Sequence, residues 1–196
     1  MNATPLNLGT DRGGQTSSAP LRARDCLRGS AREVLARLAD GDPLGVAARI
    51  AQHLTQQRLL MDEHRAFLRC LAFIARASQR YAGRPGIDRW LKEQVVRGVS
   101  SLRSVGASGE PGARWSELAQ TFGLGTEDLD RACARFHALP FEARDAFFSL
   151  VLEGQAIEDL VYPGSRSAVE IATDARRALE VFLSLQSQPR AQGVCS

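Results

Sequence analysis

The sequence predicts an all-α protein made of two small helical modules joined by a flexible linker, the second of them helix-turn-helix-like. Three observations predict this fold. Apolar residues recur every three or four positions along most of the chain, which is the period of an amphipathic helix. Two Ser-x-x-Glu patterns have the form of the capping box that begins a helix. A stretch rich in Gly, Ser and Pro, residues 104–113, interrupts the helical pattern and predicts the linker.

The first module is expected over residues 30–103, after a disordered tail. Residues 1–29 are rich in Gly, Ser, Thr, Pro and Arg and have no apolar period, which predicts the tail. Helical structure begins at Ser30, whose capping-box partner is Glu33. A break at residues 41–43 ends this helix, and a second helix is expected over residues 44–60.

The helix predicted over residues 62–81 has two unlike faces. Its apolar residues cover one side, and four arginines fall in a narrow sector of the other: Arg65, Arg69, Arg76 and Arg80. This spacing predicts an amphipathic helix with a cationic ridge. After a turn at residues 83–86, Asp88 is the expected N-cap of a helix whose apolar face runs from Leu91 to Leu102.

The second module, residues 114–185, is expected to contain shorter helices. One lies near Trp115, one follows Thr126, and one begins at Pro140 and ends at Gly154. A short helix over residues 157–161, a type II turn at 162–165 and a long last helix come next. Two helices joined by a tight turn have the geometry of a helix-turn-helix. Residues 186–196 are expected to form a second disordered tail.

The net charge of +3 conceals an uneven distribution. Residues 65–103 contain nine cations and two acids, whereas residues 141–185 contain four cations and eight acids. Tyr81 and Trp90 lie among the cations as stacking surfaces for unpaired bases. The first module is therefore expected to contact a polyanion, although a solvated face explains the same residues equally well.

No group of residues in the sequence indicates catalysis or metal binding. The three histidines lie on separate predicted helices without metal-binding spacing, and the four cysteines are far apart. We therefore expect no catalytic residue, metal or cofactor, and a protein that is not an enzyme; an unrecognised hydrolase is the least favoured alternative. Without an apolar run long enough for a membrane helix or a signal peptide, the chain is expected to be cytoplasmic with no membrane partner.

Two stretches resemble the extracytoplasmic-function class of bacterial sigma factors, the subunits that direct RNA polymerase to promoters. ARASQRYAGRPGIDRWLKEQVVRGVSSLR, residues 75–103, is similar to part of the first domain of that family, called region 2. Residues 138–182 are similar to its last domain, region 4, and keep Leu-Pro at 139–140, LEG at 152–154 and ARR at 175–177. The predicted linker lies where the family has one.

This resemblance implies a degenerate sigma-factor-like transcription regulator that binds RNA polymerase core and promoter DNA, uses no cofactor, and has an anti-sigma or other protein partner. The DNA contacts expected from the first module are Arg80, Arg84, Arg89, Trp90, Lys92 and Arg97. Those expected from the second module are Ser165, Arg166, Ser167 and Glu170.

Departures from the family pattern favour a rival interpretation. Residues 67–73, FLRCLAF, are apolar and basic where the family has an acidic, polar helix that meets the polymerase. The predicted recognition helix carries Glu170, whereas the family often has a lysine or arginine near this position. The rival is a non-catalytic helical protein-binding adaptor, derived from a sigma factor that has lost DNA recognition. Exposed cations converging beside Trp90 would favour the regulator, and a buried Trp90 with arginines paired to acids would favour the adaptor.

Overall fold

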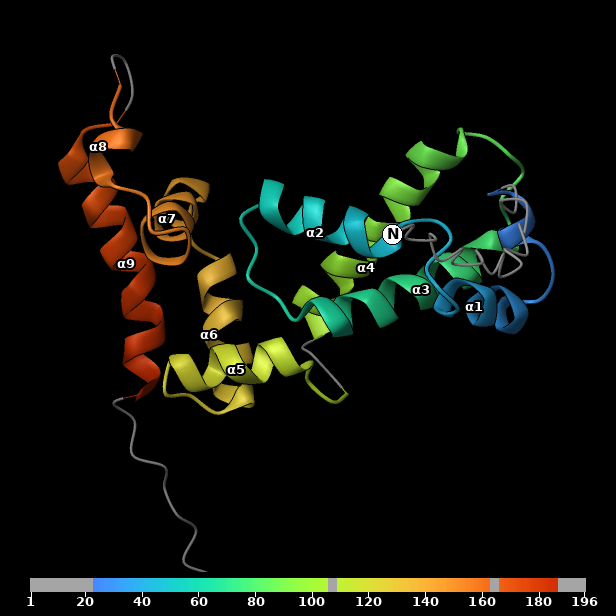
Figure 1. Cartoon of the computed structure of the whole chain (residues 1–196), viewed down its shortest axis with the longest axis horizontal. Helices are drawn as coiled ribbons and strands as arrows, with labels where there is room; N and C mark the ends of the chain where they lie inside the picture. The colour runs from blue at the N-terminus through green and yellow to red at the C-terminus, as the bar shows by residue number, and fades with distance from the viewer. Residues whose placement is uncertain (1–22, 106–108, 163–165, 187–196) are drawn as a thin grey trace, which may run out of the picture.

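The computed structural model describes residues 23–105, 109–162 and 166–186, and every regular element in these ranges is a helix (Figure 1). The prediction of an all-α protein is confirmed. The division into two modules and the helix-turn-helix-like corner remain predictions. In the described part of the chain, no helix combines the length and the apolar character that crossing a membrane requires.

The helices follow the predicted order, with ends within a few residues of the predicted ones. The first half of the chain contains η1 (Asp25–Leu27), α1 (Ala31–Ala39), α2 (Val46–Gln56), α3 (Glu63–Ser78) and α4 (Ile87–Val105). The second half contains α5 (Ala113–Thr121), α6 (Thr126–His137), α7 (Phe141–Phe147), the π-helical turn η2 (Phe148–Leu152), α8 (Ile157–Leu160) and α9 (Ala168–Gln186).

Side-chain caps fix where several helices begin. The Ser30 side chain accepts a hydrogen bond from the backbone of Glu33, whose carboxylate accepts one from the Ser30 backbone, as the capping-box pattern predicts. The prediction that Asp88 caps α4 is wrong. That helix begins one residue earlier, at Ile87, and the Asp88 carboxylate pairs with Arg49 of α2 at 2.6 Å. A tertiary ion pair has replaced the expected local cap.

A first buried cluster lies among η1 and α1 to α4. Helices α3 and α4 lie close together in this cluster, since a Cβ on Gly98 of α4 would lie 2.6 Å from the Cys70 sulfur of α3. Glycine at this position lets the two helices pack tightly. Cys26 and Leu27 are also buried in this cluster. The structure therefore differs from the predicted tail over residues 23–29, because two isolated apolar residues produce no periodic signal.

A second buried cluster is centred on three phenylalanines of the other half. The Phe147 ring centroid lies 5.2 Å from that of Phe136 and 5.3 Å from that of Phe182, which joins α6, α7 and α9. Leu60, from the segment between α2 and α3, is buried in the same cluster. The apolar packing of the second half thus includes a residue from the first.

Ion pairs and hydrogen bonds connect the two halves further. Arg58 pairs with Asp145 at 2.7 Å and with Glu153 at 2.8 Å. Arg65 pairs with Asp130 at 2.7 Å. These pairs join the ends of α2 and α3 to α6, α7 and η2.

The predicted linker lies close to this connection. Helix α4 continues to Val105, and residues 106–108 lie outside the described residues. The backbone N–H of Gly112 donates a 2.9 Å hydrogen bond to the carboxylate of Asp62, the N-cap of α3. The end of the predicted linker is therefore held against the first half.

Candidate nucleic-acid interface

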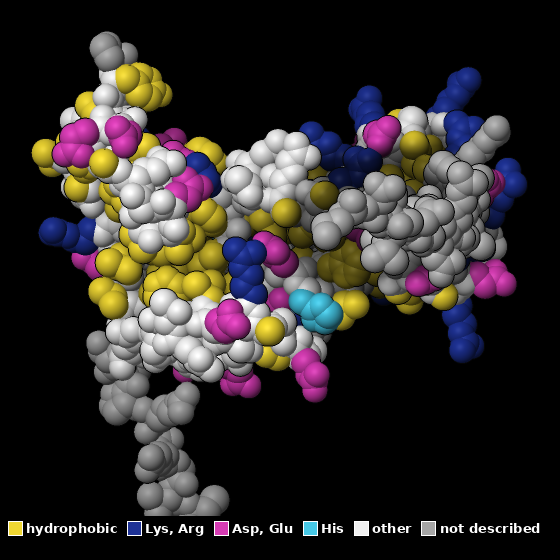
Figure 2. Space-filling model, in the orientation of Figure 1, with side chains coloured by type: hydrophobic (Ala, Val, Ile, Leu, Met, Phe, Trp, Pro, Cys, Tyr) yellow, Lys and Arg dark blue, Asp and Glu magenta, His cyan; other side chains and the backbone are white. Residues whose placement is uncertain are grey.

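Helix α4 and the segment just before it present the cations that the first half was predicted to bring to DNA. Leu91, Val95 and Val99 are buried on the inner face of this helix, whereas Arg89, Lys92 and Arg97 are exposed. Five predicted contacts are exposed: Arg80 after α3, Arg84 in the following turn, and Arg89, Lys92 and Arg97 on α4. Figure 2 shows Lys and Arg side chains gathered over the end of the molecule where α4 begins.

Most of these cations have no carboxylate partner in the part of the chain that the structure describes. The exception is Arg89, whose Nε lies 3.4 Å from a carboxylate oxygen of Glu93 on the same helix. A surface ion pair of this kind contributes only about 0–1 kcal/mol, so a phosphate could replace Glu93 at small cost. The interface therefore offers mainly unneutralised positive charge.

Trp90 is not exposed, contrary to the prediction that its ring is a stacking surface for bases. Only 7% of this residue is accessible, and its ring stacks on Tyr81 with centroids 4.5 Å apart. The Tyr81 hydroxyl donates a 3.0 Å hydrogen bond to the Pro85 carbonyl. The two aromatic residues therefore hold the turn that carries Arg84. In the sequence, Trp90 directly precedes Leu91, at the edge of the apolar face of the helix. This position could have predicted that Trp90 is buried.

The four arginines of α3 do not form one exposed ridge, contrary to the prediction. Arg65 is 7% exposed and lies between Asp62 and Asp130. Arg69 donates a 2.9 Å hydrogen bond to the hydroxyl of Ser101 on α4. The remaining two members are exposed: Arg76 and Arg80. Helix periodicity places the four arginines in one sector. Contacts with other helices cover the two at the start of that sector, Arg65 and Arg69.

The residues predicted to contact bases from the second half are bound within the protein. Arg166 donates a 2.8 Å hydrogen bond to Asp174 and lies 3.8 Å from Asp145. Ser167 and Glu170 form a capping box at the start of α9, and hydrogen bonds from the backbone and then the hydroxyl of Ser167 lower the pKa of the Glu170 carboxyl. Ser165 lies outside the described residues. A base contact here would have to break these bonds.

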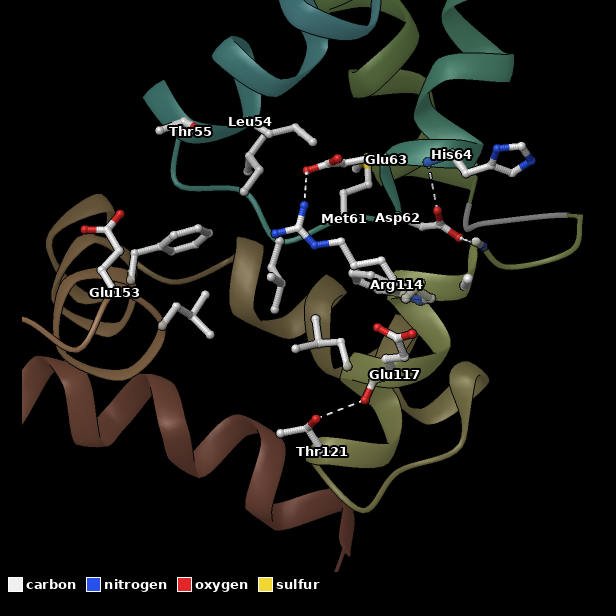
Figure 3. Close-up of a pocket in the computed structure, with 18 residues that line it drawn as sticks. Leu54, Thr55, Met61, Asp62, Glu63, His64, Arg114, Glu117, Thr121 and Glu153 are labelled. Carbon is white, nitrogen blue, oxygen red and sulfur yellow. Dashed lines mark hydrogen bonds and ion pairs between the residues drawn. The ribbon is translucent and has the colours of Figure 1, made fainter. Parts of the chain in front are cut away.

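A pocket of about 750 Å³ lies between the two halves of the chain (Figure 3). Arg114 extends across it toward Glu63, at 3.7 Å, and Glu153 lies on the opposite wall. The carboxylate of Glu117 adds another negative charge to the lining. Excess negative charge would repel a polyanion, so this pocket is separate from the interface on α4. Among the described residues, no group of three or more His, Cys, Asp or Glu side chains could hold a metal ion.

Comparisons of the chain with protein-family models, with curated proteins and with solved structures found no match. The resemblance to sigma factors therefore stays an expectation drawn from the motif residues.

Proposed function

We propose that the protein is a non-catalytic, sigma-factor-like transcription regulator, and that its first half contacts the sugar–phosphate backbone of promoter DNA. RNA polymerase core is its proposed partner. One observation carries the DNA contact, namely the exposed cations of α4 and the preceding turn: Arg80, Arg84, Arg89, Lys92 and Arg97. Guanidinium and ammonium groups of this kind neutralise phosphates and fix the position of a nucleic acid.

This contact is expected to depend little on base sequence. Sequence is read by side chains that reach base edges or stack on bases. Trp90 is buried, and Arg166 and Glu170 are bound to neighbouring residues. Backbone contacts supply non-specific affinity, so discrimination between promoters would have to come from the assembly with polymerase.

A protein-binding adaptor with the same fold is the second candidate. It is favoured by the burial of Trp90 and by the Arg89–Glu93 ion pair. The eight acids of residues 141–185 also disfavour nucleic acid in that half of the chain. The two candidates predict different DNA affinities for arginine variants. In an adaptor, the surface arginines would have no role in binding DNA, so replacing them would leave the affinity unchanged.

The affinity of arginine variants for DNA separates the two candidates. Fluorescence anisotropy of labelled single- and double-stranded DNA with the full chain is expected to show several-fold weaker binding for Arg84→Ala and for Arg97→Ala, because each change removes one phosphate contact. Arg177→Ala is the matched control, since it removes an exposed arginine from α9. Equal affinities for all three variants and the wild type would support the adaptor. Co-purification of the chain with RNA polymerase core tests the proposed binding to polymerase.

A further inference from the structure

Two rows of side chains line a groove between α2 and α4. Each row recurs at helical intervals, so each forms a stripe along its helix. The α2 row is Arg49, Gln52, His53 and Gln56. The α4 row is Asp88, Arg89, Lys92, Val95 and Val96. The groove has a volume of about 290 Å³ and is bridged by the ion pair between Arg49 and Asp88.

The groove is positively charged and rich in hydrogen-bond donors. Its lining contains three cations and one carboxylate, and that carboxylate is engaged by Arg49 at 2.6 Å. The side chains of Gln52 and Gln56 are exposed and add amide N–H groups. Lys92 is exposed on the opposite wall. This set of groups fits an anion with several acceptor oxygens.

His53 is the titratable residue of the α2 wall. It is half-buried on the α2 wall, and its pKa is lowered first by burial and then by the charges of Lys92 and Arg103. The imidazole is therefore neutral near pH 7, where it can donate one hydrogen bond and accept another. Arg49, Arg89 and the paired Asp88 complete the charged groups that line the groove around it.

The α4 wall of the groove also has a small apolar part. Val96 is 36% exposed and offers a small surface for a sugar or a base edge, whereas Val95, at 1% exposed, offers almost none. The volume lies at the lower end of the range for small-molecule sites, about 300–1,000 Å³, and suits one phosphate with its sugar. The pocket between the halves is larger, but its carboxylates exclude such a ligand.

We propose that the groove between α2 and α4 binds one nucleotide of a nucleic-acid strand, with the phosphate against Lys92 and Arg89 and the sugar against Val96. This inference rests on the proposed function, because Arg89 and Lys92 belong both to the groove and to the cations of α4. It adds a defined phosphate-ester site to a surface that otherwise attracts DNA by charge alone.

Lys92 makes the test direct, because it is the only lysine in the chain. An amine-reactive reagent therefore modifies Lys92 and the α-amino group, and mass spectrometry follows both rates in one sample of the full chain. Thymidine 5′-monophosphate is expected to slow the modification of Lys92 several-fold without affecting the α-amino group. Thymidine, which lacks the phosphate, is expected to give no protection.

A matched pair of variants shows whether the protection comes from the groove. Gln52→Glu places a carboxylate on the α2 wall and is expected to abolish protection. Gln120→Glu makes the same change at an exposed position of α5 and is expected to retain it. No protection of the wild type, or equal protection in Gln52→Glu, would overturn the inference. Protection by inorganic phosphate as strong as that by the nucleotide would overturn the assignment to a nucleotide.

A short oligothymidylate distinguishes a strand from a free nucleotide. Protection at a lower concentration of the oligonucleotide than of the monophosphate supports a strand, and the reverse order overturns that part of the inference. The test is separate from that of the proposed function. If Lys92 is unprotected while Arg84→Ala and Arg97→Ala still weaken DNA binding, the groove site fails and the proposed function stands.

Discussion

His137, the last residue of α6, is a histidine held neutral in the protein interior. It is 9% exposed, and burial, followed by repulsion from Arg103, lowers its pKa to about 4. The backbone carbonyl of the same residue accepts a 3.4 Å hydrogen bond from Arg103 of α4. This residue therefore lies where the two halves of the chain meet, and its protonation would place a charge in that contact.

The free energy of unfolding is expected to fall as the pH drops from 7 to 5. An unfolded histidine takes up a proton near pH 6.5, whereas the folded one does so near pH 4. Between these values the unfolded state binds more protons, so stability is lost as the pH falls, by about 2 kcal/mol at pH 5. Urea unfolding at both pH values measures the loss. His137→Gln should remove most of it, and a variant with the pH dependence of the wild type would contradict this explanation.

The residues of the interface differ in how well the sequence predicts them. Exposure of Arg84, Arg89 and Lys92 follows from local charge density and helix period. The burial of Arg65 does not, because its partner Asp130 lies 65 residues away in the chain. Local patterns carry no information on such tertiary partners. The sequence therefore predicts which part of the chain carries the cations. It does not predict which of them form ion pairs inside the protein, because that depends on tertiary packing.

The end of α2 shows how one element is fixed by contacts with another. Arg58, just past the helix end, has a φ of +46°, a left-handed conformation that costs a non-glycine residue about 1–2 kcal/mol. Its side chain reaches Asp145 and Glu153, and its guanidinium lies 5.5 Å from the centroid of the Phe148 ring. Phe148 is the first residue of the π-helical turn η2, and Glu153 directly follows its last residue. The ion pairs thus offset the backbone strain.

Replacing Arg58 separates the strain from the ion pairs. Arg58→Ala loses the ion pairs and keeps the strained backbone, whereas Arg58→Gly loses the ion pairs and relieves the strain. We expect the glycine variant to be more stable than the alanine variant by about 1 kcal/mol, with the wild type above the alanine variant. Guanidinium chloride unfolding measures the order. An alanine variant as stable as the glycine variant would show that the backbone at this position is not strained.

The helices themselves were the most predictable elements. Periodic apolar residues and the capping box of Ser30 and Glu33 determine helices locally, so their positions can be derived from the sequence. The ion pairs that Asp88 forms with Arg49 and that Glu153 forms with Arg58 could not, because each pair joins residues far apart in the sequence. The sequence thus predicts the elements better than the contacts between them.

At the scale of the whole molecule, charge is separated along the chain. Exposed cations gather over the end of the molecule where α4 begins (Figure 2), while acids exceed cations in residues 141–185. Arg58 and Arg65 form ion pairs within the protein, and these pairs connect the two halves of the chain. A nucleic acid is therefore expected to bind one end of the molecule and to leave the other end free for a protein partner.

The salt dependence of single-stranded DNA binding tests this account most directly. If the five exposed cations of the interface each contact one phosphate, the logarithm of the affinity should fall with the logarithm of salt concentration with a slope of about −3.5. The Arg84→Ala, Arg97→Ala double variant should reduce the steepness by about 1.4, two contacts at about 0.7 each. A wild-type affinity that does not change with salt, or a double variant with the wild-type slope, would contradict the proposed interface.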